Sequence, residues 1–368
     1  MKMFRTTPSG ISVWNRPVLR ICVAFATVAV LAAGSGAPGT LAARGLFHHS
    51  GKTTQAKHYT IAVIPKGLDN PVFFYAHYGA DKRAQELGNV TVDWTASSTS
   101  DVTQEVQVIN GLIARHVDAM AVDANAPGPL IGPVNKAVKA GIKVIAWDSD
   151  VVGSNEAAFY GISSFAMGVK LAQETIHFMG TKGTVILVSG GPGATNLNQR
   201  LAGAKSALKK YPGIHLLGPF FHNDDLPTAQ KLTNSLLTAH PTAGAILMVA
   251  GVPFFGAMSA LPKVIQNHGK VKIITTDTLA AELPFVKDGY VQALVGQDYW
   301  GWGYQSVQIL YNMLAKHCTY PHFVFQAMPV VTKANVGQWI SKWKQASTAA
   351  GAARVFKESP VACGAHSS

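Results

Sequence analysis

Two acids that directly follow an apolar stretch are the first residues in this sequence that could do chemistry. Residues 144–147 are apolar and end in Trp147, and Asp148, Ser149 and Asp150 come at once after them. In open α/β sheets, ligands bind beyond the carboxyl ends of parallel strands, because side chains leave the buried core there. The stretch at 141–150 therefore predicts a polar ligand site.

Another acid occupies the same place later in the chain. Residues 139–145 read Lys-Ala-Gly-Ile-Lys-Val-Ile and precede Asp148, while residues 268–274 read His-Gly-Lys-Val-Lys-Ile-Ile and precede Asp277. Both stretches have the order of a helix end, a glycine, a basic residue, an apolar strand and a terminal acid. We expect two similarly built lobes, with Asp148 and Asp277 facing one shared cleft.

Strands alternate with helices on both sides of these acids. The first half has predicted strands at 59–64, 90–94, 118–122 and 142–147, with helices between them. The order starts again after residue 164, with strands at 184–189, 214–220, 243–249 and 271–276, and one of the helices is expected at 253–268. Such alternation predicts an α/β fold in which parallel sheets are covered by helices on both faces.

The N-terminus has the pattern of a secretory signal peptide. Residues 1–43 contain four basic residues and no acid, and the apolar run at 21–33 is followed by small residues. The run is short for a membrane anchor, which is the alternative. We expect a flexible arm at 44–57, a mobile tail at 347–368, and a periplasmic or otherwise extracytoplasmic location.

Charge narrows the range of expected partners, and the cysteines allow a disulfide. The formal net charge of +12 falls to +8 without the four basic residues of the leader. The remaining excess is scattered, so a nucleic acid partner is not expected. Two cysteines remain after removal of the leader, Cys318 and Cys363. Outside the cytoplasm they can either pair as a disulfide or stay free.

Motifs for catalysis are weak. Residues 161–165 lack the final glycine of a nucleophile elbow, and the thirteen histidines show no zinc-enzyme spacing. The turn at 190–193 has Pro192 where a dinucleotide loop needs glycine. We expect a protein without catalytic activity, cofactor or metal; a two-lobed repressor would carry a DNA-reading domain in place of the leader.

Between residues 59 and 332 the sequence resembles the secreted sugar-binding proteins of ABC importers, of the ribose-binding type. The motifs are Ile-Ala-Val-Ile-Pro-Lys at 61–66, Asp-Asn-Pro-Val-Phe-Phe at 69–74, Val-Ile-Ala-Trp-Asp-Ser-Asp at 144–150, Leu-Leu-Thr-Ala-His-Pro at 236–241, and Asp277 followed by Gln297. The first and third motifs are most similar to the branch of rhamnose-binding and autoinducer-2-binding proteins.

The resemblance implies two doubly wound lobes joined by three hinge strands, which close on one small ligand. The N-terminal lobe would comprise 58–163 and 298–325, and the C-terminal lobe 164–297 and 326–346 with a closing helix. We expect a monomer that delivers a sugar or polyol to an ABC permease and its ATPase. A sensory receptor and a secreted carbohydrate-active enzyme remain alternatives.

By position, the resemblance implies ligand contacts from Lys66, Asn70, Phe73, Asp148, Asp150, Asn198, Asp277 and Gln297. Four departures leave the ligand open. Ribose binders have arginines where this chain has Ser149 and Asn198, and an asparagine where it has Ala250. The Asp-Gln pair of autoinducer-2 binders reads Asn-Leu at 196–197.

A neutral polyol presents hydroxyl groups that both donate and accept, so its binder needs ionised acceptors and amides. The acids and amides of this set meet that need, and Lys66 can donate to a ring oxygen or neutralise the acids. Aromatic rings can stack on the C–H face of a sugar, and the candidates are Phe73, Trp147 and Trp300. Alternatively, either acid can cap a following helix, and Trp147 can pack in the core.

Overall fold

The computed structural model describes residues 57–364 of the 368-residue chain. The predicted signal peptide at 1–43 and all but the last residue of the predicted arm at 44–57 lie outside the described residues, and both stay predictions. Within the described part, no helix has the length and apolar character needed to cross a membrane.

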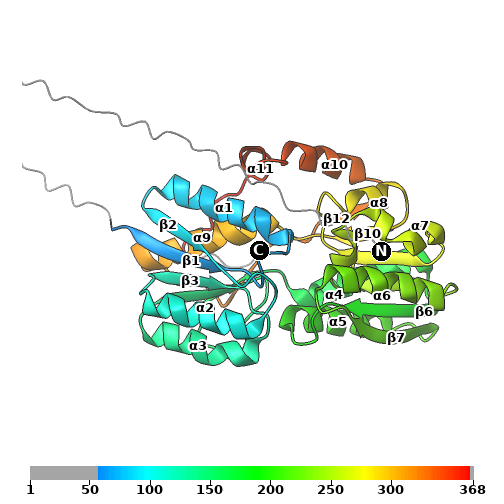
Figure 1. The fold of residues 1–368 in the computed structure, drawn as a ribbon, viewed down its shortest axis with the longest axis horizontal. Helices are drawn as coiled ribbons and strands as arrows, with labels where there is room; N and C mark the ends of the chain where they lie inside the picture. The colour runs from blue at the N-terminus through cyan, green and yellow to red at the C-terminus, as the bar shows by residue number, and fades with distance from the viewer. Residues whose placement is uncertain (1–56, 365–368) are drawn as a thin grey trace, which may run out of the picture. The chain divides into compact units, whose positions relative to one another are not determined.

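Two six-stranded sheets organise the chain (Figure 1). The first sheet is parallel throughout, whereas the second has one antiparallel neighbour pair, β10 and β12. In spatial order, the first sheet contains β11 (Phe323–Phe325), β5 (Phe159–Gly161), β4 (Lys143–Trp147), β3 (Ala119–Val122), β1 (Tyr59–Ile64) and β2 (Val90–Trp94). The second contains β12 (Val330–Thr332), β10 (Ala293–Val295), β9 (Lys272–Thr276), β8 (Ala245–Met248), β6 (Gly183–Ser189) and β7 (Ile214–Phe221).

Helices cover both faces of each sheet. Those of the first lobe are α1 (Val72–Leu87), α2 (Val102–Ala114), α3 (Pro127–Lys139) and α9 (Tyr299–Ala315). The second lobe contains α4 (Ser164–Met179), α5 (Thr195–Leu208), α6 (Leu226–Ala239), α7 (Pro262–Asn267), α8 (Leu283–Lys287) and the 3₁₀ turns η1 (Val252–Phe254) and η2 (Met258–Ala260). The last helices are α10 (Val336–Gln345) and α11 (Ala349–Val355).

The central strands are apolar on both sides, which is why helices can cover both faces. In β1, Ile61 and Val63 belong to the core under α1 and α9, whereas Ala62 and Ile64 belong to the core under α2 and α3. Figure 1 shows these helix pairs on opposite sides of the first sheet. The alternation follows from the two-residue period of a strand, so a central parallel strand needs apolar residues at every position.

Glycines let one helix pair in each lobe approach closely. A Cβ atom at Gly168 of α4 would overlap the carbonyl oxygen of Arg200 on α5, and a Cβ at Gly303 of α9 would overlap the carbonyl oxygen of Ala76 on α1. Side chains larger than hydrogen at these two crossings would force the helices apart. The two crossings therefore fix α5 and α9, which both contribute to the site described below.

Three chain segments pass from one sheet to the other and hydrogen-bond to each other. They are residues 161–164, 296–298 and 326–329. The Gln326 amide donates to the Gly161 carbonyl at 2.7 Å, and the Gly296 amide donates to the Pro329 carbonyl at 2.7 Å. The fold is thus the two-lobed parallel-sheet architecture with a three-strand hinge that the sequence predicts.

One predicted helix is wrong in its extent. Residues 253–268 form two 3₁₀ turns and the short helix α7 instead of one continuous helix. Pro262 is the first residue of α7. Proline lacks an amide hydrogen and its ring clashes with the carbonyl four residues earlier, so a helix cannot run through this position without a break.

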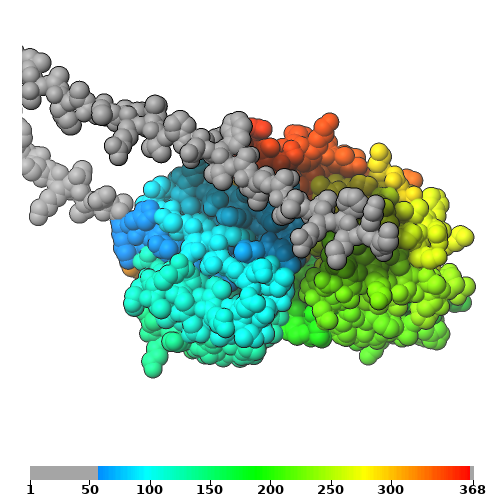
Figure 2. Space-filling model, in the orientation of Figure 1, coloured from blue at the N-terminus to red at the C-terminus, as the bar shows by residue number. Residues whose placement is uncertain are grey.

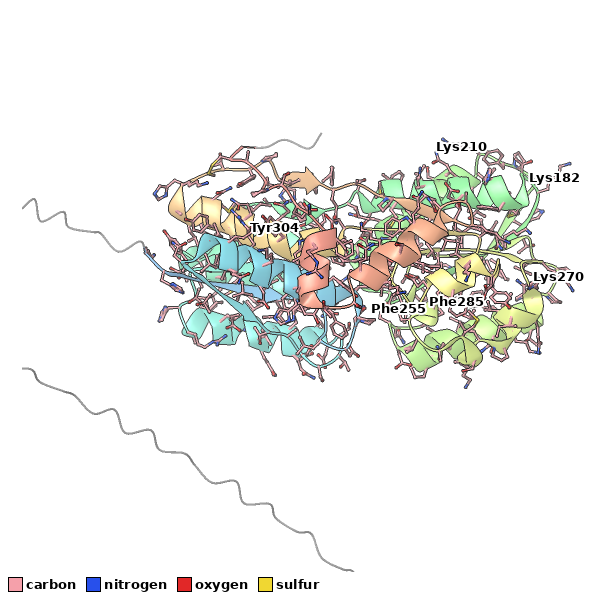
Figure 3. All side chains as sticks on the ribbon, turned by 90° about the horizontal axis from the view of Figure 1, so that it is seen from above. Lys182, Lys210, Phe255, Lys270, Phe285 and Tyr304 are labelled. Atoms are coloured by element: carbon pink, nitrogen blue, oxygen red, sulfur yellow. A yellow bond between two sulfur atoms is a disulfide. The ribbon has the colours of Figure 1, made fainter. Side chains whose placement is uncertain are left out.

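The prediction of a mobile tail after residue 347 is also wrong for its ordered part. Helix α11 packs against α1, and Phe356 stacks on Trp300 with ring centroids 6.3 Å apart. Cys363 forms a disulfide with Cys318, with Cα atoms 5.4 Å apart. Figures 2 and 3 show α10 and α11, in orange and red tones, lying across both lobes. Composition indicated disorder, but apolar contacts and a covalent link fix this segment.

Candidate functional site

The two strand-end acids have matching backbone geometry. Asp148 follows β4 with φ 54°, and Asp277 follows β9 with φ 74°. The Asp148 amide donates to the Tyr160 carbonyl at 3.1 Å, and the Asp277 amide donates to the Val295 carbonyl at 3.0 Å. A positive φ is costly for residues other than glycine and is concentrated at functional sites. Neither acid caps a following helix, so that alternative is wrong.

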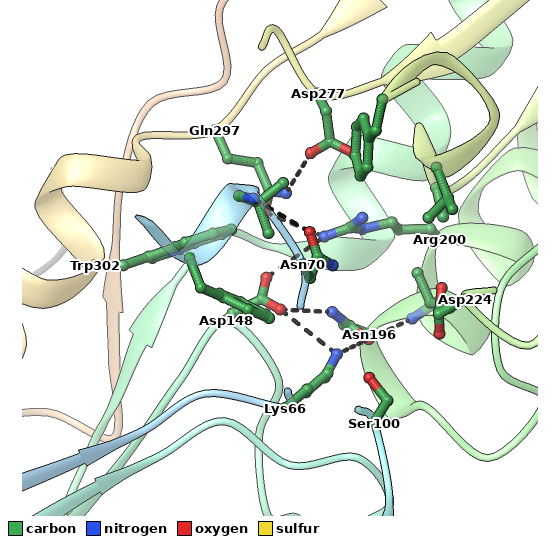
Figure 4. Close-up of a pocket in the computed structure, with 16 residues that line it drawn as sticks. Lys66, Asn70, Ser100, Asp148, Asn196, Arg200, Asp224, Asp277, Gln297 and Trp302 are labelled. Atoms are coloured by element: carbon green, nitrogen blue, oxygen red, sulfur yellow. Dashed lines mark hydrogen bonds and ion pairs between the residues drawn. The ribbon is translucent and has the colours of Figure 1, made fainter. Parts of the chain in front are cut away.

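A cavity of about 50 Å³ lies between the lobes, at the ends of these strands (Figure 4). Its polar lining from the first lobe includes Lys66, Asn70 and Asp148. The polar side chains from the second lobe include Asn196, Arg200, Asp277 and Gln297. A ligand pocket for a drug-sized molecule is several times larger. This cavity is small because its polar side chains occupy the space and contact one another.

Asp148 is the carboxylate that joins the lobes. Its Oδ2 accepts a hydrogen bond from Asn196 at 3.1 Å and a longer one from Lys66 at 3.5 Å. Its Oδ1 lies 3.7 Å from the Arg200 guanidinium and has no hydrogen-bond partner. Asp148 is only 5% exposed. Its carboxylate thus keeps one oxygen available for a hydroxyl donor.

Lys66 is held by acids on several sides. Its ammonium lies 3.7 Å from Asp123 and donates to Asn196 at 3.2 Å. Burial acts to lower the pKa of Lys66, but the combined attraction of Asp123, Asp148 and Asp224 outweighs it and raises the pKa. Lys66 therefore remains a charged donor inside the cavity.

Arg200 and Gln297 connect the two acids. The Arg200 guanidinium donates to the Val249 carbonyl and to the Gln297 side-chain oxygen, each at 3.1 Å. The Gln297 amide then donates to Asp277 at 3.3 Å. Arg200 is 3% exposed and its Nε has no partner. The chain of contacts runs from Asp148 through Arg200 and Gln297 to Asp277.

Asp277 accepts hydrogen bonds from its own lobe and from the first residue of α9. Its Oδ2 accepts from the Gly251 amide at 3.1 Å and from Thr276 at 3.0 Å, and its Oδ1 accepts from Tyr299 at 3.0 Å. Behind it lies Glu282, whose pKa is raised well above its ordinary value by burial and by the Asp277 charge. Asp277 therefore fixes the β8–η1 loop and Gln297.

Aromatic side chains complete the walls. Phe73 from α1 and Trp302 from α9 line the cavity on the first lobe's side, and Phe255 lines it on the second lobe's side. Trp147 lies behind them, completely buried, with its ring 5.6 Å from that of Phe73 and 5.7 Å from that of Trp302. Rigid rings on two sides can cover the apolar faces of a flat ligand.

Six of the ten predicted ligand residues line the cavity: Lys66, Asn70, Phe73, Asp148, Asp277 and Gln297. Asn70 also accepts a hydrogen bond from the Val72 amide at 3.1 Å, which fixes the start of α1.

Asn198 was assigned to the cavity incorrectly. It is exposed and donates to the Pro192 carbonyl at 2.8 Å, whereas Asn196 and Arg200 line the cavity. Successive residues of an α-helix are rotated by about 100°, so positions 196 and 200 share one face and 198 points away. Although position 198 lacks the arginine of ribose binders, Arg200 brings an arginine into the cleft.

The two predicted tryptophans are core residues. Trp147 packs among Phe73, Trp94 and Trp302, and Trp300 packs against Phe356 under α11. Trp302 takes the place expected of Trp300, because two residues along a helix change the face.

Asp150 lies outside this cavity, beside His322 at 3.4 Å.

Sequence reasoning missed Asn196, Arg200, Trp302 and the supporting acid Asp123. The four-residue spacing of Asn196 and Arg200 at the start of a helix was the available signal. Asp123 follows β3 as Asp148 follows β4, so the rule of strand-end acids could have found it.

A larger cavity of about 470 Å³ continues from the first one. Both cavities share Asn70, Ser100, Asp224, Val252 and Phe255 in their walls. The second cavity is therefore the approach to the buried polar groups.

The model of the periplasmic binding protein domain family matches residues 61–317. The D-allose-binding periplasmic protein of Escherichia coli K12 is 28% identical over 246 residues, which are 64% of this chain and 78% of that protein. An ABC transporter solute-binding protein of Burkholderia graminis, solved with D-arabinose, is 30% identical with a TM-score of 0.71, covering 76% of this chain and 97% of that one. A solute-binding protein of Agrobacterium vitis with bound D-fucose is 26% identical, with a TM-score of 0.73, covering 77% and 99%.

The family match spans most of the chain, and all the residues that line the cavity fall within it. The chain belongs to the periplasmic binding protein domain family.

Proposed function

We propose that this chain binds one neutral monosaccharide between its lobes, outside the cytoplasm, and delivers it to the permease and ATPase of an ABC importer. The observation that carries the proposal is the convergence of charged and amide side chains from both lobes on one buried cavity. The named ligands of the relatives, D-allose, D-arabinose and D-fucose, support a pentose or hexose of this kind.

The residue set matches the chemistry of sugar hydroxyls. Asp148 accepts, Lys66 and Arg200 donate, and Asn196 and Gln297 do both. A hydrogen bond to a charged group contributes about 1.5–3 kcal/mol net. Three or four of them, offset by ordering costs, are consistent with a dissociation constant of about 1 μM.

Ligand entry would replace contacts between the lobes. The bond from Asn196 to Asp148 and the bond from Lys66 to Asn196 join the two lobes directly. Sugar hydroxyls can take over these bonds from both sides, so a liganded cleft would stay closed while an empty one can open about the hinge.

A thermal-shift screen tests this function. The ligands would be D-arabinose, D-ribose, D-allose, D-fucose and L-rhamnose, with amino acids as a control set, and positive results would be measured again by titration calorimetry. A ligand at 100 times its dissociation constant should add about 2.7 kcal/mol to the free energy of unfolding. No stabilisation by any sugar, or equal stabilisation by amino acids, would contradict the proposal.

A further inference from the structure

Asp150, which does not reach the sugar cavity, belongs to a separate cluster at the edge of the first sheet. Asp150, Glu156 and His322 each offer one ligand atom, and these three atoms lie within 4.8 Å of one another. They come from the loop after β4, the segment before β5 and the residue before β11.

The acids in this cluster outnumber its basic groups. Asp150 and Glu156 are each only 8% exposed, and Asp150 Oδ1 is a buried oxygen without a hydrogen-bond partner. Within residues 57–364, the His322 ring is the one basic side chain within ion-pair distance of either acid, at 3.4 Å from Asp150 Oδ2. Two buried carboxylates side by side favour a cation between them.

The backbone holds the three segments in place. The Phe159 amide donates to the His322 carbonyl, and the Ala146 amide donates to the Ala158 carbonyl at 2.8 Å. Phe159 also pairs with Phe323 in the sheet register. Ligand atoms presented by fixed strands lose little freedom when they bind an ion.

The geometry points to a binding site for a divalent transition-metal cation such as Zn²⁺, formed by Asp150, Glu156 and His322. In a tetrahedral zinc site with bonds of about 2.0–2.1 Å, ligand atoms lie about 3.3 Å apart, close to the 3.4 Å between His322 Nε2 and Asp150 Oδ2. One imidazole with two carboxylates suits zinc better than calcium or magnesium, which prefer all-oxygen sites.

The site has an entry path and a mechanical consequence. The His322 side chain is 45% exposed, so an ion can reach it from solvent. His322 precedes β11, a three-residue edge strand that leads into the third hinge segment. A bound cation would tie this strand to the β4–β5 loop and reduce its local opening.

Titration calorimetry with zinc chloride on the full secreted chain, stripped with EDTA, tests the site. We expect His322→Ala and Glu156→Gln each to weaken this binding at least tenfold or to remove one equivalent. The exposed His215 of β7 supplies the matched control, since His215→Ala should leave it unchanged. Zinc should slow hydrogen exchange of residues 319–326 in the wild type and in the control His215→Ala. It should not slow this exchange in His322→Ala or Glu156→Gln.

Folding is checked by circular dichroism in EDTA, and His322→Gln serves if His322→Ala does not fold. Zinc binding that is the same in the wild type and in His322→Ala, Glu156→Gln and His322→Gln would place the ion elsewhere and overturn the proposal. Absence of zinc binding to the wild type would overturn it as well, and the two acids would then share a proton. Tighter binding of calcium than of zinc would also contradict it.

Discussion

The two strand-end acids, Asp148 and Asp277, share a backbone conformation but differ in their partners. Asp148 is contacted by Asn196 and Arg200 from the opposite lobe and keeps one oxygen without a hydrogen bond. Asp277 accepts four hydrogen bonds, including one from the Gly251 amide. The repeat in the sequence thus duplicated a position but not its surroundings. We propose that Asp148 exchanges partners with a ligand, whereas Asp277 holds the Gly251 amide, Gln297 and Tyr299 in place.

The supporting acids Asp123 and Glu282 also differ in their partners. Asp123 stands behind Asp148 with Lys66 between the two, whereas Glu282 stands behind Asp277 without a cation between them, and the pKa of Glu282 rises through burial and the Asp277 charge. A charged donor is therefore available beside Asp148, while the carboxyl groups of Asp277 and Glu282 face each other without one, although burial raises the pKa of both supporting acids, Asp123 and Glu282.

The largest expected effect is the loss of sugar binding in Asp148→Ala. Charge-assisted bonds from both lobes and from the ligand end on this carboxylate, so we expect at least a hundredfold weaker binding, about 3 kcal/mol. Lys66 keeps Asp123 and Arg200 keeps Gln297 as partners, so the ligand-free protein should stay folded. Titration calorimetry measures the change; an unaltered dissociation constant would remove Asp148 from the site.

Asp277→Ala should act mainly on stability. It leaves the buried Gly251 amide, the Tyr299 hydroxyl and the Gln297 amide without their acceptor. Unpaired buried donors cost about 1–3 kcal/mol each, partly offset by relief of Glu282, so we expect a loss of about 3 kcal/mol in the free energy of unfolding without ligand. Urea unfolding monitors it. Unchanged stability would make Asp277 a ligand contact like Asp148.

A smaller effect distinguishes the faces of α5. Asn196→Ala removes the bond to Asp148 and the acceptor for Lys66, so binding should weaken about tenfold, about 1.4 kcal/mol. Asn198→Ala is the matched control, because Asn198 donates to the Pro192 carbonyl and does not line the cavity, and the affinity of this variant should equal that of the wild type. Titration calorimetry on both variants measures the affinities. Weaker binding in Asn198→Ala, with unchanged binding in Asn196→Ala, would contradict this assignment of the two faces.

The last prediction concerns pH and the first lobe. Burial raises the pKa of Glu105 to about 7, against hydrogen bonds from Asn125 that act to lower it. An acid with a raised folded pKa contributes stability below its ordinary pKa of 4.5, and this contribution is lost as the pH rises from 4.5 through about 7. Within that window Glu105→Gln should reduce the decline by about 1 kcal/mol per pH unit. Urea unfolding at several pH values measures it, and identical slopes in both proteins would contradict it.

The repeat of strand, acid and helix was readable from the sequence, because parallel strands buried on both faces leave long apolar runs and their terminal acids stand out. Asp148 and Asp277 were found for that reason, whereas Lys66, Asn70 and Gln297 were found through the resemblance. The sequence did not show which helix residues point into the cleft, and the predicted positions were off by two residues. Asn198 and Trp300 were therefore predicted in place of Asn196, Arg200 and Trp302.

The different roles of the paired acids could not be predicted either. The partners of Asp277 include the Gly251 amide and Tyr299, which lie 26 and 22 residues away in the chain. Only the folded β8–η1 loop and α9 bring these donors to it. A local pattern records that an acid ends a strand, whereas its hydrogen bonds are set by tertiary packing.

The most direct measurement of the difference between the acids is thermal unfolding of Asp148→Asn and Asp277→Asn, each with and without the sugar found in the screen. The expected result is a ligand-free melting temperature near that of the wild type for Asp148→Asn, with no stabilisation by sugar, and a clearly lower ligand-free melting temperature for Asp277→Asn. The opposite pattern, a destabilised Asp148→Asn beside an Asp277→Asn that matches the wild type without ligand, would contradict the assignment of both acids.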